Sequence, residues 1–394
     1  MVTDHPAFVI GVSEARPSER ASTGAQASRL PAKSFDAMPG KRDACAPVAL
    51  AHSRASETNS DIFGATMSLL IINDVEVEHL LPMNECIIVM EEAFGGLARG
   101  DFYQPLRTIT TPPDVKGVMA LMPAFRAGQT PRFGLKAICV FPGNAALGKD
   151  AHQGGVLLFD GTNGEPLAIA NASAITAIRT AAVSGLATRL LAREGAADLA
   201  IIGAGVQART HLSAMSSVRR LTRIRVAARR FASAKKFAAE MKTRAPCPIE
   251  PVESAEAAVR KADIIVTATT SHDPVINRDW LSPGVHINAV GTYSFKAREI
   301  DTATMKHATL FVDRRESALN EAGDYLIAAK EGAIGPEHIR AELSEVVTGA
   351  HPGRTSLEEI TVFKSLGLAM EDLAATDYIF RKARELGRGR LVDF

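Results

Sequence analysis

The stretch Asp198-Leu-Ala-Ile-Ile-Gly203-Ala-Gly205-Val-Gln-Ala208 decides the fold of this chain. A short run suited to a buried strand leads into a glycine turn, and helical spacing begins after it. Gly203 can adopt the backbone angles of the turn, and Gly205 lets the main chain approach a pyrophosphate. Ala208 stands where a third glycine usually lets the helix pack against the sheet, and the free N–H groups that start the helix attract phosphates. The stretch predicts a dinucleotide site, with a glycine turn in another α/β fold as the alternative.

Further strand-like runs follow the glycine turn, and helical segments alternate with them. The runs are residues 224–228, 262–269, 286–290 and 309–313. Strands that alternate with helices are typical of a parallel sheet covered by helices on both faces. The sequence therefore predicts an α/β fold with a Rossmann-type, doubly wound domain over residues 191–315.

The end of the second of these strands indicates which dinucleotide is preferred. Ala227-Ala-Arg229-Arg230 lies about 20 residues beyond the glycine turn, where an acid would bind the ribose 2′-hydroxyl of NAD(H). No acid is present there, and arginine accommodates the 2′-phosphate of NADP(H). We therefore expect NADP(H) to be preferred, with NAD(H) possible. The alternative is that Arg229 and Arg230 are solvated residues at a strand end.

Residues 67–190 have a different pattern. A strand is expected at 68–72 and a helix at 84–98, and the short strand-like runs after them are broken by Pro and Gly. Closely spaced strands of this kind predict a mostly antiparallel sheet or a small barrel. A long helix, expected at 175–192, links this region to the glycine turn.

Residues 1–66 are rich in Ala, Ser, Arg and Pro, with seven basic and seven acidic side chains. No helical or strand period persists, so little apolar surface could be buried to offset the entropy of ordering. The continuous apolar stretch of a secretory signal is missing, and the acids argue against an organelle transit peptide. We expect a disordered extension, or a true start at Met67.

Charge and composition exclude several classes of partner. The 394 residues include 45 Lys and Arg against 44 Asp and Glu, so no net field favours nucleic acid or an anionic membrane. No apolar run approaches the ~18 residues that a membrane span needs. The four cysteines are Cys45, Cys86, Cys139 and Cys247. Because they are scattered and no ligand set has metal spacing, we expect reduced thiols in a cytoplasmic protein without a metal site.

Six stretches together make the chain similar to the ornithine cyclodeaminase/mu-crystallin family over residues 67–394. They are Ala120-Leu-Met-Pro-Ala124, Phe141-Pro-Gly-Asn144, Ile175-Thr-Ala-Ile-Arg-Thr-Ala-Ala182, Ile202-Gly-Ala-Gly-Val-Gln-Ala208, Ile287-Asn-Ala-Val-Gly291 and Phe363-Lys-Ser-Leu-Gly367 with Glu371-Asp372. The resemblance implies an NAD(P)-binding Rossmann domain. It also implies a discontinuous α+β substrate domain, made from residues 67–190 and a C-terminal return at 316–394, through which members form homodimers.

The resemblance also implies an activity on small amino or cyclic imino acids. Known members include ornithine cyclodeaminases, alanine dehydrogenases, and reductases of ketimines such as Δ1-pyrroline-2-carboxylate. Mu-crystallin also binds thyroid hormone. We therefore expect hydride transfer between a bound nicotinamide and a small 2-imino or 2-amino acid.

Three cations match the family positions that bind the substrate carboxylate: Arg107, Lys136 and Arg179. Lys136 interrupts an apolar run, and a charge in a buried strand is costly unless it is paired. An arginine can grip a carboxylate with two parallel hydrogen bonds, whereas a lysine contributes a point charge and can donate a proton. We assign Lys136 a catalytic role as well. The alternative for each cation is a salt bridge or a snorkelling surface side chain.

The expected cofactor contacts lie on the glycine turn and on later strand ends. They are Gly203, Gly205, Val206, Gln207, Ala208, Arg229, Arg230, Thr269, Ser271 and Gly291. His211, in the helix after the turn, is expected to have a packing role, and the role of His272 is open.

The turn after strand 262–269 separates the candidate reactions. The cyclodeaminases carry there an Asp that contacts the substrate amine, and Ser271 falls at that position in this chain. Asp273 could replace that acid as a catalytic residue, although Asp before Pro274 is an ordinary turn pair. We therefore expect reduction of a preformed imine, or its reverse. The alternatives are ornithine cyclodeamination and a non-catalytic, mu-crystallin-like NADP(H)-dependent binding protein.

Overall fold

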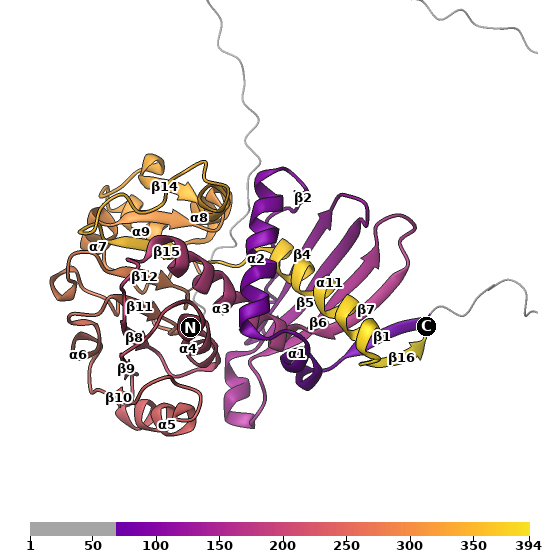
Figure 1. Cartoon of the computed structure of the whole chain (residues 1–394), viewed down its shortest axis with the longest axis horizontal. Coiled ribbons are helices and arrows are strands. Elements are labelled where there is room, and N and C mark those ends of the chain that lie inside the picture. The colour runs from indigo at the N-terminus through magenta and orange to yellow at the C-terminus, as the bar shows by residue number, and fades with distance from the viewer. Residues whose placement is uncertain (1–67, 293) are drawn as a thin grey trace, which may run out of the picture. The chain divides into compact units, whose positions relative to one another are not determined.

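The computed structural model describes residues 68–292 and 294–394, and two eight-stranded sheets organise that part of the chain (Figure 1). The first sheet has the order β16-β1-β7-β6-β5-β4-β2, with β3 paired to β4. Its strands are β1 (Ser68–Ile72), β2 (Phe102–Tyr103), β3 (Thr108–Thr110), β4 (Val118–Arg126), β5 (Arg132–Val140), β6 (His152–Asp160), β7 (Pro166–Asn171) and β16 (Arg390–Asp393). Only the β1–β7 pair is parallel among these described strands, so the mostly antiparallel sheet is confirmed, in an open form.

The central strands of this sheet have two different faces because successive side chains of a strand alternate between them. Met122, Lys136 and Leu158 are buried on one face. Helices α3 (Ala172–Leu191) and α11 (Ala369–Leu386) lie against this sheet, and α2 (Met83–Ala98) packs against both of them (Figure 1). The other face carries partly exposed apolar side chains such as Leu135 and Leu157.

Local sequence signals explain where the first helices begin. Helix α1 (Asp74–Leu80) starts at a capping box, in which the Asn73 side chain accepts from the Glu76 N–H and the Glu76 side chain from the Asn73 N–H. Helix α3 starts where the Asn171 side chain accepts from the Ala174 N–H. Since α3 packs against both α2 and α4 (Val206–Val218), it lacks a polar face over most of its length.

The second sheet is parallel throughout, with the order β10-β9-β8-β11-β12-β15-β13-β14. Its strands are β8 (Asp198–Ile202), β9 (Arg223–Ala227), β10 (Ile249–Pro251), β11 (Ile264–Thr267), β12 (His286–Ala289), β13 (Thr309–Val312), β14 (Ile339–Glu342) and β15 (Thr361–Lys364). The chain leaves β8 on one side toward β9 and returns on the other side at β11. This reversal is the point at which open α/β sheets bind ligands. The predicted Rossmann-type fold is confirmed.

Short helices connect the strands of the second sheet. Besides α4 they are α5 (Phe231–Met241), α6 (Ala255–Val259), α7 (Thr302–His307), α8 (Arg315–Glu321), α9 (Gly323–Lys330) and α10 (Leu343–Val347). Three 3-10 turns complete the described elements: η1 (Pro142–Leu147), η2 (Arg278–Trp280) and η3 (Pro336–His338).

The chain returns to the first sheet later than the sequence predicts, since the expected point of return was residue 316. Strands β14 and β15 follow that point in the sequence, yet both belong to the parallel sheet, where β15 lies between β12 and β13. Of the described elements beyond residue 364, α11 and β16 reach the first sheet. The four-residue β15 run is too short to be assigned to a sheet without its neighbours, which explains the difference.

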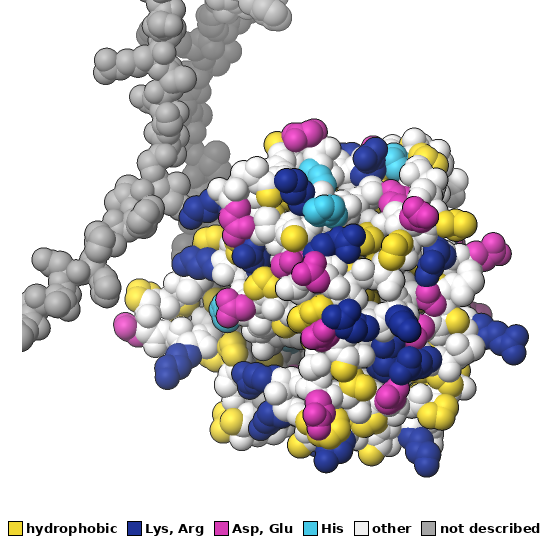
Figure 2. Space-filling model, turned by 90° about the vertical axis from the view of Figure 1, so that its left-hand side faces the viewer, with side chains coloured by type: hydrophobic (Ala, Val, Ile, Leu, Met, Phe, Trp, Pro, Cys, Tyr) yellow, Lys and Arg dark blue, Asp and Glu magenta, His cyan; other side chains and the backbone are white. Residues whose placement is uncertain are grey.

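The expectation for residues 1–66, and the Cys45 thiol within them, lie outside the described residues. No helix in the described ranges is long and apolar enough to cross a membrane. Figure 2 shows the side of the molecule formed by the second sheet and its helices, where basic, acidic and apolar side chains are interspersed.

Candidate functional site

The glycine turn between β8 and α4 has the geometry that a pyrophosphate needs. Gly203 has φ +123°, and a Cβ at this position would lie 2.4 Å from the Ala268 carbonyl oxygen, so the turn requires glycine. A Cβ on Gly205 would meet open space, which leaves room for a ligand. Gly205 is also the N-cap of α4, and no side chain caps that helix. The first N–H groups of α4 are therefore available to an anion.

The residues after the turn divide into exposed and buried positions. Val206 is exposed and Ala208 is buried, as expected for a helix that packs closely on the sheet. The Gln207 side-chain amide donates to the Thr176 carbonyl oxygen at 3.4 Å, which joins α4 to α3. His211 donates from Nδ1 to the Gln207 carbonyl oxygen at 2.7 Å and accepts at Nε2 from the Ser184 hydroxyl at 2.9 Å. Burial lowers the pKa of His211 to about 4, which fits the expected packing role of a neutral imidazole.

Arg229 and Arg230 lie just beyond β9, after Ala228, and both are exposed. Arg230 is the N-cap residue of α5. In the part of the chain that the structure describes, no ion pair joins either arginine to an acid. Both guanidinium groups are therefore available to an anionic ligand at this strand end.

A buried carboxylate that the sequence analysis missed joins the ends of β11 and β12. Glu299 is fully buried and accepts from the Thr267 hydroxyl at 2.9 Å and from the N–H groups of Thr269 and Gly291 at 2.7 Å each. Position 291 requires a glycine, because a Cβ on Gly291 would lie 2.2 Å from the Thr269 carbonyl oxygen. Burial raises the pKa of Glu299. Two of the expected cofactor contacts, Thr269 and Gly291, are thus held side by side.

A second buried layer supports Glu299. Asp324 Oδ1 accepts from the Glu299 N–H at 2.7 Å, and Asp324 Oδ2 lies 2.8 Å from Lys364 Nζ. Lys364 ends β15 and donates to the Thr292 carbonyl oxygen at 2.7 Å. A lysine at the end of a buried apolar strand is costly without a partner, so Lys364 carries the same sequence signal as Lys136.

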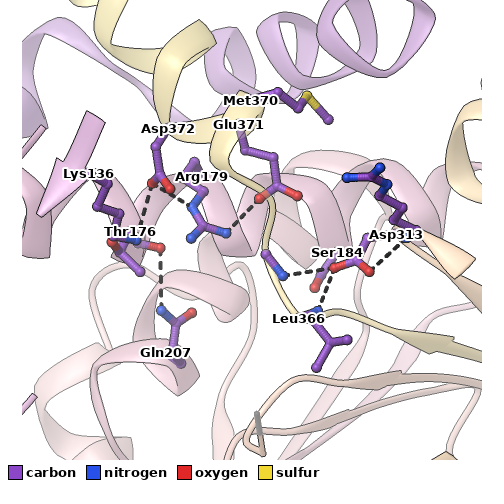
Figure 3. A network of polar contacts seen from close by, with 12 residues as sticks. Lys136, Thr176, Arg179, Ser184, Gln207, Asp313, Leu366, Met370, Glu371 and Asp372 are labelled. Atoms are coloured by element: carbon purple, nitrogen blue, oxygen red, sulfur yellow. Dashed lines mark hydrogen bonds and ion pairs between the residues drawn. The ribbon is translucent and has the colours of Figure 1, made fainter. Parts of the chain in front are cut away.

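The structure brings Lys136 and Arg179 together on one carboxylate oxygen (Figure 3). Lys136 lies on β5 and Arg179 on α3, and each is 3% exposed. Asp372 Oδ1 lies 3.3 Å from Lys136 Nζ and 3.1 Å from Arg179 Nε. Glu371 Oε2 accepts from a terminal nitrogen of Arg179 at 2.6 Å. Both acids lie in the first turn of α11.

Burial and neighbouring charges determine the protonation of this cluster. Burial lowers the pKa of Lys136 to about 8, although Asp372 opposes the shift. Burial raises the pKa of Glu371 to about 7, although Arg179 opposes that shift. Burial disfavours the charge of Arg179, but the carboxylates of Asp372 and Glu371 outweigh it and raise the pKa of the guanidinium. The second oxygen of each acid has no hydrogen-bond partner among the described residues.

Arg107 is held by the loop that leads into α11. It donates to the carbonyl oxygens of Leu366 and Gly367 at 2.9 Å each, and its Nε lies 3.0 Å from Glu321 Oε2. Arg107, Gln104, Glu321 and Gly367 line one pocket. Gly367 has φ +79°, and a Cβ there would lie 2.4 Å from Arg179. The carbonyl oxygen of Gly367 thus accepts from Arg107, and its lack of a side chain leaves room for Arg179.

Asp313, at the end of β13, fixes this loop. It is fully buried, and its Oδ2 accepts from the N–H groups of Leu366 at 2.5 Å and Gly367 at 2.8 Å. Burial raises the pKa of Asp313, although these N–H donors oppose the shift. The carboxylate thus couples the C-terminal end of β13 to the segment that carries Glu371 and Asp372.

Each of the three predicted cations has an acidic partner within the described chain. The salt bridge that the sequence analysis left open as an alternative is therefore present for Arg107, Lys136 and Arg179. A ligand carboxylate at these cations must share them with Glu321, Glu371 and Asp372 or displace those acids.

The loop after β11 holds Asp273 in a local turn. The Ser271 hydroxyl donates to the Asp273 carbonyl oxygen at 2.7 Å, which closes a local turn. The Asp273 side chain is exposed, and in the described part of the chain no hydrogen bond or ion pair joins its carboxylate to Arg107, Lys136 or Arg179. This geometry matches the turn-pair interpretation.

Residues 68–292 and 294–394 contain no group of three His, Cys, Asp or Glu side chains that could hold a metal ion. Cys86, Cys139 and Cys247 are free thiols.

Comparisons with known proteins identify relatives of this chain. The model of a family described as the ornithine cyclodeaminase/mu-crystallin family matches residues 67–387. A Δ1-pyrroline-2-carboxylate reductase of Bacillus cereus is 37% identical over 332 residues, which are 83% of this chain and all of the relative.

Two solved structures have the same fold. A Thermococcus litoralis Δ1-pyrroline-2-carboxylate reductase, in complex with NADH and L-proline, is 41% identical with a TM-score of 0.79. The superposition covers 82% of this chain and 99% of the other. An archaeal alanine dehydrogenase dimer with bound NAD is 34% identical with a TM-score of 0.77, over 83% of this chain and 100% of the other.

We predict that Gly291→Ala weakens dinucleotide binding at least about tenfold, or about 1.4 kcal/mol. The new Cβ would collide with the Thr269 backbone and with Glu299 and would separate the two loops. Fluorescence titration with NADPH and NADH measures the effect, and thermal melting checks that the variant folds. Gly195→Ala is the matched control, since its Cβ meets open space. A folded Gly291→Ala protein that binds both dinucleotides normally contradicts the assignment.

Proposed function

Because the chain belongs to the ornithine cyclodeaminase/mu-crystallin family, we propose that it reduces a small 2-imino acid to the 2-amino acid with NAD(P)H, or catalyses the reverse reaction. The observation that carries the proposal is the buried pair Lys136–Arg179, which faces the loop anchored to the parallel sheet by Asp313. The relatives named above act on Δ1-pyrroline-2-carboxylate or alanine. A cyclic imine with an adjacent carboxylate is therefore the substrate class that we favour.

Substrate orientation is the task of the three cations. A guanidinium can form paired hydrogen bonds to a carboxylate, which Arg179 and Arg107 can do once a protein partner releases them, and Lys136 adds a point charge from β5. Because these groups come from three separate segments of the chain, a bound carboxylate is held against rotation. Its 2-imino carbon can then face the end of the parallel sheet at which Thr269 and Gly291 lie.

When bound, NAD(P)H supplies a hydride from its nicotinamide C4 to the imine carbon. The reaction also consumes one proton, since the imine becomes an amine: 2-imino acid, NAD(P)H and H⁺ give 2-amino acid and NAD(P)⁺. Lys136 is the candidate donor of that proton to the substrate nitrogen. A lysine pKa of about 8 keeps most of the side chain protonated near neutral pH and makes proton transfer easier than from an ordinary lysine.

The residues that would hold the dinucleotide suit its pyrophosphate, its ribose phosphate and its nicotinamide. The turn at Gly203 and Gly205 and the uncapped start of α4 suit the pyrophosphate. Arg229 and Arg230 suit a 2′-phosphate, so we propose that NADP(H) is preferred and NAD(H) is accepted. Thr269, Ser271 and Gly291 surround the strand ends where the nicotinamide belongs.

The position of Asp273 favours reduction over cyclodeamination. Releasing ammonia from ornithine needs an anion beside the cationic amine, and Ser271 and the exposed Asp273 do not provide one in this arrangement. The alternative of a binding protein without turnover retains the same site, so only a rate measurement separates it from the reductase.

A substrate panel tests the proposed function. We expect NADPH oxidation with Δ1-pyrroline-2-carboxylate or Δ1-piperideine-2-carboxylate to be faster than with pyruvate plus ammonia, measured by loss of absorbance. L-ornithine with NAD⁺ serves as the opposing substrate. Proline and ammonia formed from ornithine faster than the imines react would establish the cyclodeaminase. Tight NADPH binding without turnover of any substrate would establish the binding protein.

A charge reversal tests the cofactor preference. Arg229→Asp combined with Arg230→Ala removes two cations at the end of β9, and we expect NADPH affinity to fall about tenfold or more while NADH affinity changes little. Fluorescence titrations with both dinucleotides measure the difference. Arg220→Asp is the control, because this exposed arginine precedes β9 at the opposite end of the sheet. Equal losses for both dinucleotides contradict a 2′-phosphate role.

We further propose that the protein is a cytoplasmic homodimer joined through the first sheet. The sheet face opposite the helices carries partly exposed Leu121, Phe125, Leu135, Leu157 and Phe159 on adjacent strands. The Phe125 and Phe133 rings lie 4.6 Å apart on this face. Contiguous apolar surface of this kind is typical of a protein interface. The three free thiols are consistent with a reducing compartment.

Light scattering tests the dimer. We expect the wild-type protein to have twice the mass of one chain, and Met119→Glu with Phe133→Glu to give monomers, because charges on that face must be desolvated in a dimer. Ile88→Glu is the control, since Ile88 is similarly exposed on α2. A dimer that survives the double substitution places the interface elsewhere.

A further inference from the structure

Glu371 and Asp372 occupy the hydrogen-bonding edges of Arg179 that a carboxylate ligand needs. A guanidinium grips a carboxylate through two neighbouring nitrogens, either Nε with one terminal nitrogen or both terminal nitrogens. Asp372 accepts from Nε at 3.1 Å, and Glu371 accepts from a terminal nitrogen at 2.6 Å. Each edge therefore has one N–H already engaged (Figure 3). A two-pronged contact with a ligand requires one of the two acids to release Arg179.

The contacts of the two acids indicate which one is released. Asp372 Oδ1 is shared by Lys136 and Arg179, so its withdrawal would break contacts with both cations. Glu371 contacts Arg179 through Oε2, and its Oε1 has no hydrogen-bond partner among the described residues. Glu371 is also fully buried, where a carboxylate that loses its cation cannot remain charged without a large cost.

We propose that Glu371 releases Arg179 to the carboxylate of the substrate and takes up one proton from solvent as it does so, which makes it a positioning residue for substrate binding. The proton returns to solvent when the ligand leaves, so no other reactant is needed. This inference rests on the proposed function, because it takes the ligand to be a carboxylate bound at Arg179.

The charges that face Glu371 favour this exchange. Arg179 approaches it from α3, Asp372 from its own helix and Asp313 from the end of β13, while the buried Cys86 thiol faces it from α2. Two anions thus surround Glu371 against one cation, and an arriving carboxylate adds a third anion. The pKa of about 7 for Glu371 in the free protein means that little energy is needed to protonate it near neutral pH.

This exchange makes the affinity for a carboxylate ligand depend on pH. The protonated form of Glu371 binds the ligand, so affinity for a carboxylate falls as pH rises above about 7. Lys136 contributes a separate fall, because it loses its charge above about pH 8. At pH 7.5 a group of pKa 7 is about three-quarters ionised and a group of pKa 8 is about one-quarter deprotonated. Ligand binding at this pH should therefore show net proton uptake, of which Glu371 accounts for most.

Calorimetry with pyrrole-2-carboxylate tests the proposal. This planar anion has no imine to reduce, and proton uptake follows from its binding enthalpy in two buffers of different ionisation enthalpy. We expect net proton uptake by the wild-type protein with bound NADP⁺ at pH 7.5, and a clearly smaller uptake by Glu371→Gln, because the amide cannot take up a proton. The variant should also bind the anion at pH 8 at least as tightly as the wild type, because the amide cannot compete for Arg179 with a charge. A merely structural role for Glu371 would instead weaken binding at every pH.

Two controls make the outcomes distinct. Glu385→Gln changes an exposed acid on the same helix and should behave as the wild type. Asp372→Asn removes the shared partner of Lys136 and Arg179 and should weaken binding at every pH. Equal proton uptake by the wild type and Glu371→Gln, or none by either, overturns the inference while leaving the proposed function intact. Failure of the wild-type protein to bind the anion at any pH from about 6 to 9 overturns the proposed function as well.

Discussion

A single carboxylate oxygen, Asp372 Oδ1, joins the parts of this site. It contacts Lys136 on β5 and Arg179 on α3, and it belongs to the first turn of α11. Two cations buried this close together would repel one another without an anion between them. Removing one partner of such a group leaves an uncompensated charge in the interior, which costs several kcal/mol. The positions of strand, long helix and C-terminal helix therefore depend on this contact.

Buried carboxylates also join separate segments elsewhere in the molecule. Asp313 fixes Leu366 and Gly367 to the end of β13, and Glu299 joins β11 to β12. Each acid is satisfied mainly by backbone N–H groups or hydroxyls, which favour a fixed loop geometry rather than a flexible ion pair. The site thus consists of preorganised loops at the C-terminal ends of strands in the parallel sheet. In the Lys136–Arg179 cluster, one oxygen each of Glu371 and Asp372 has no hydrogen-bond partner among the described residues, and this is where exchange with a ligand is expected.

Much of the fold could be predicted from the sequence because its signals are local. The glycine turn at Gly203 and the alternating runs after it identify a Rossmann-type sheet, and Lys136 stands out because it interrupts an apolar strand. The place of β15 could not be predicted, since a four-residue strand can pair with any neighbour until the whole sheet is assembled. The return of the chain to the first sheet was consequently expected too early.

The sequence by itself determined the type of fold, the family and the three cations that define the candidate site, because each depends on residue identity at short spacing. Only the tertiary structure decided what those cations contact. Arg179 and Asp372 are 193 residues apart in the chain, and Lys136 and Asp372 are 236 apart. No local sequence pattern can predict a contact between residues so far apart in the chain. Glu371 and Asp372 look like ordinary acids at a helix start, and burial between α3, β5 and β13 gives them their unusual chemistry.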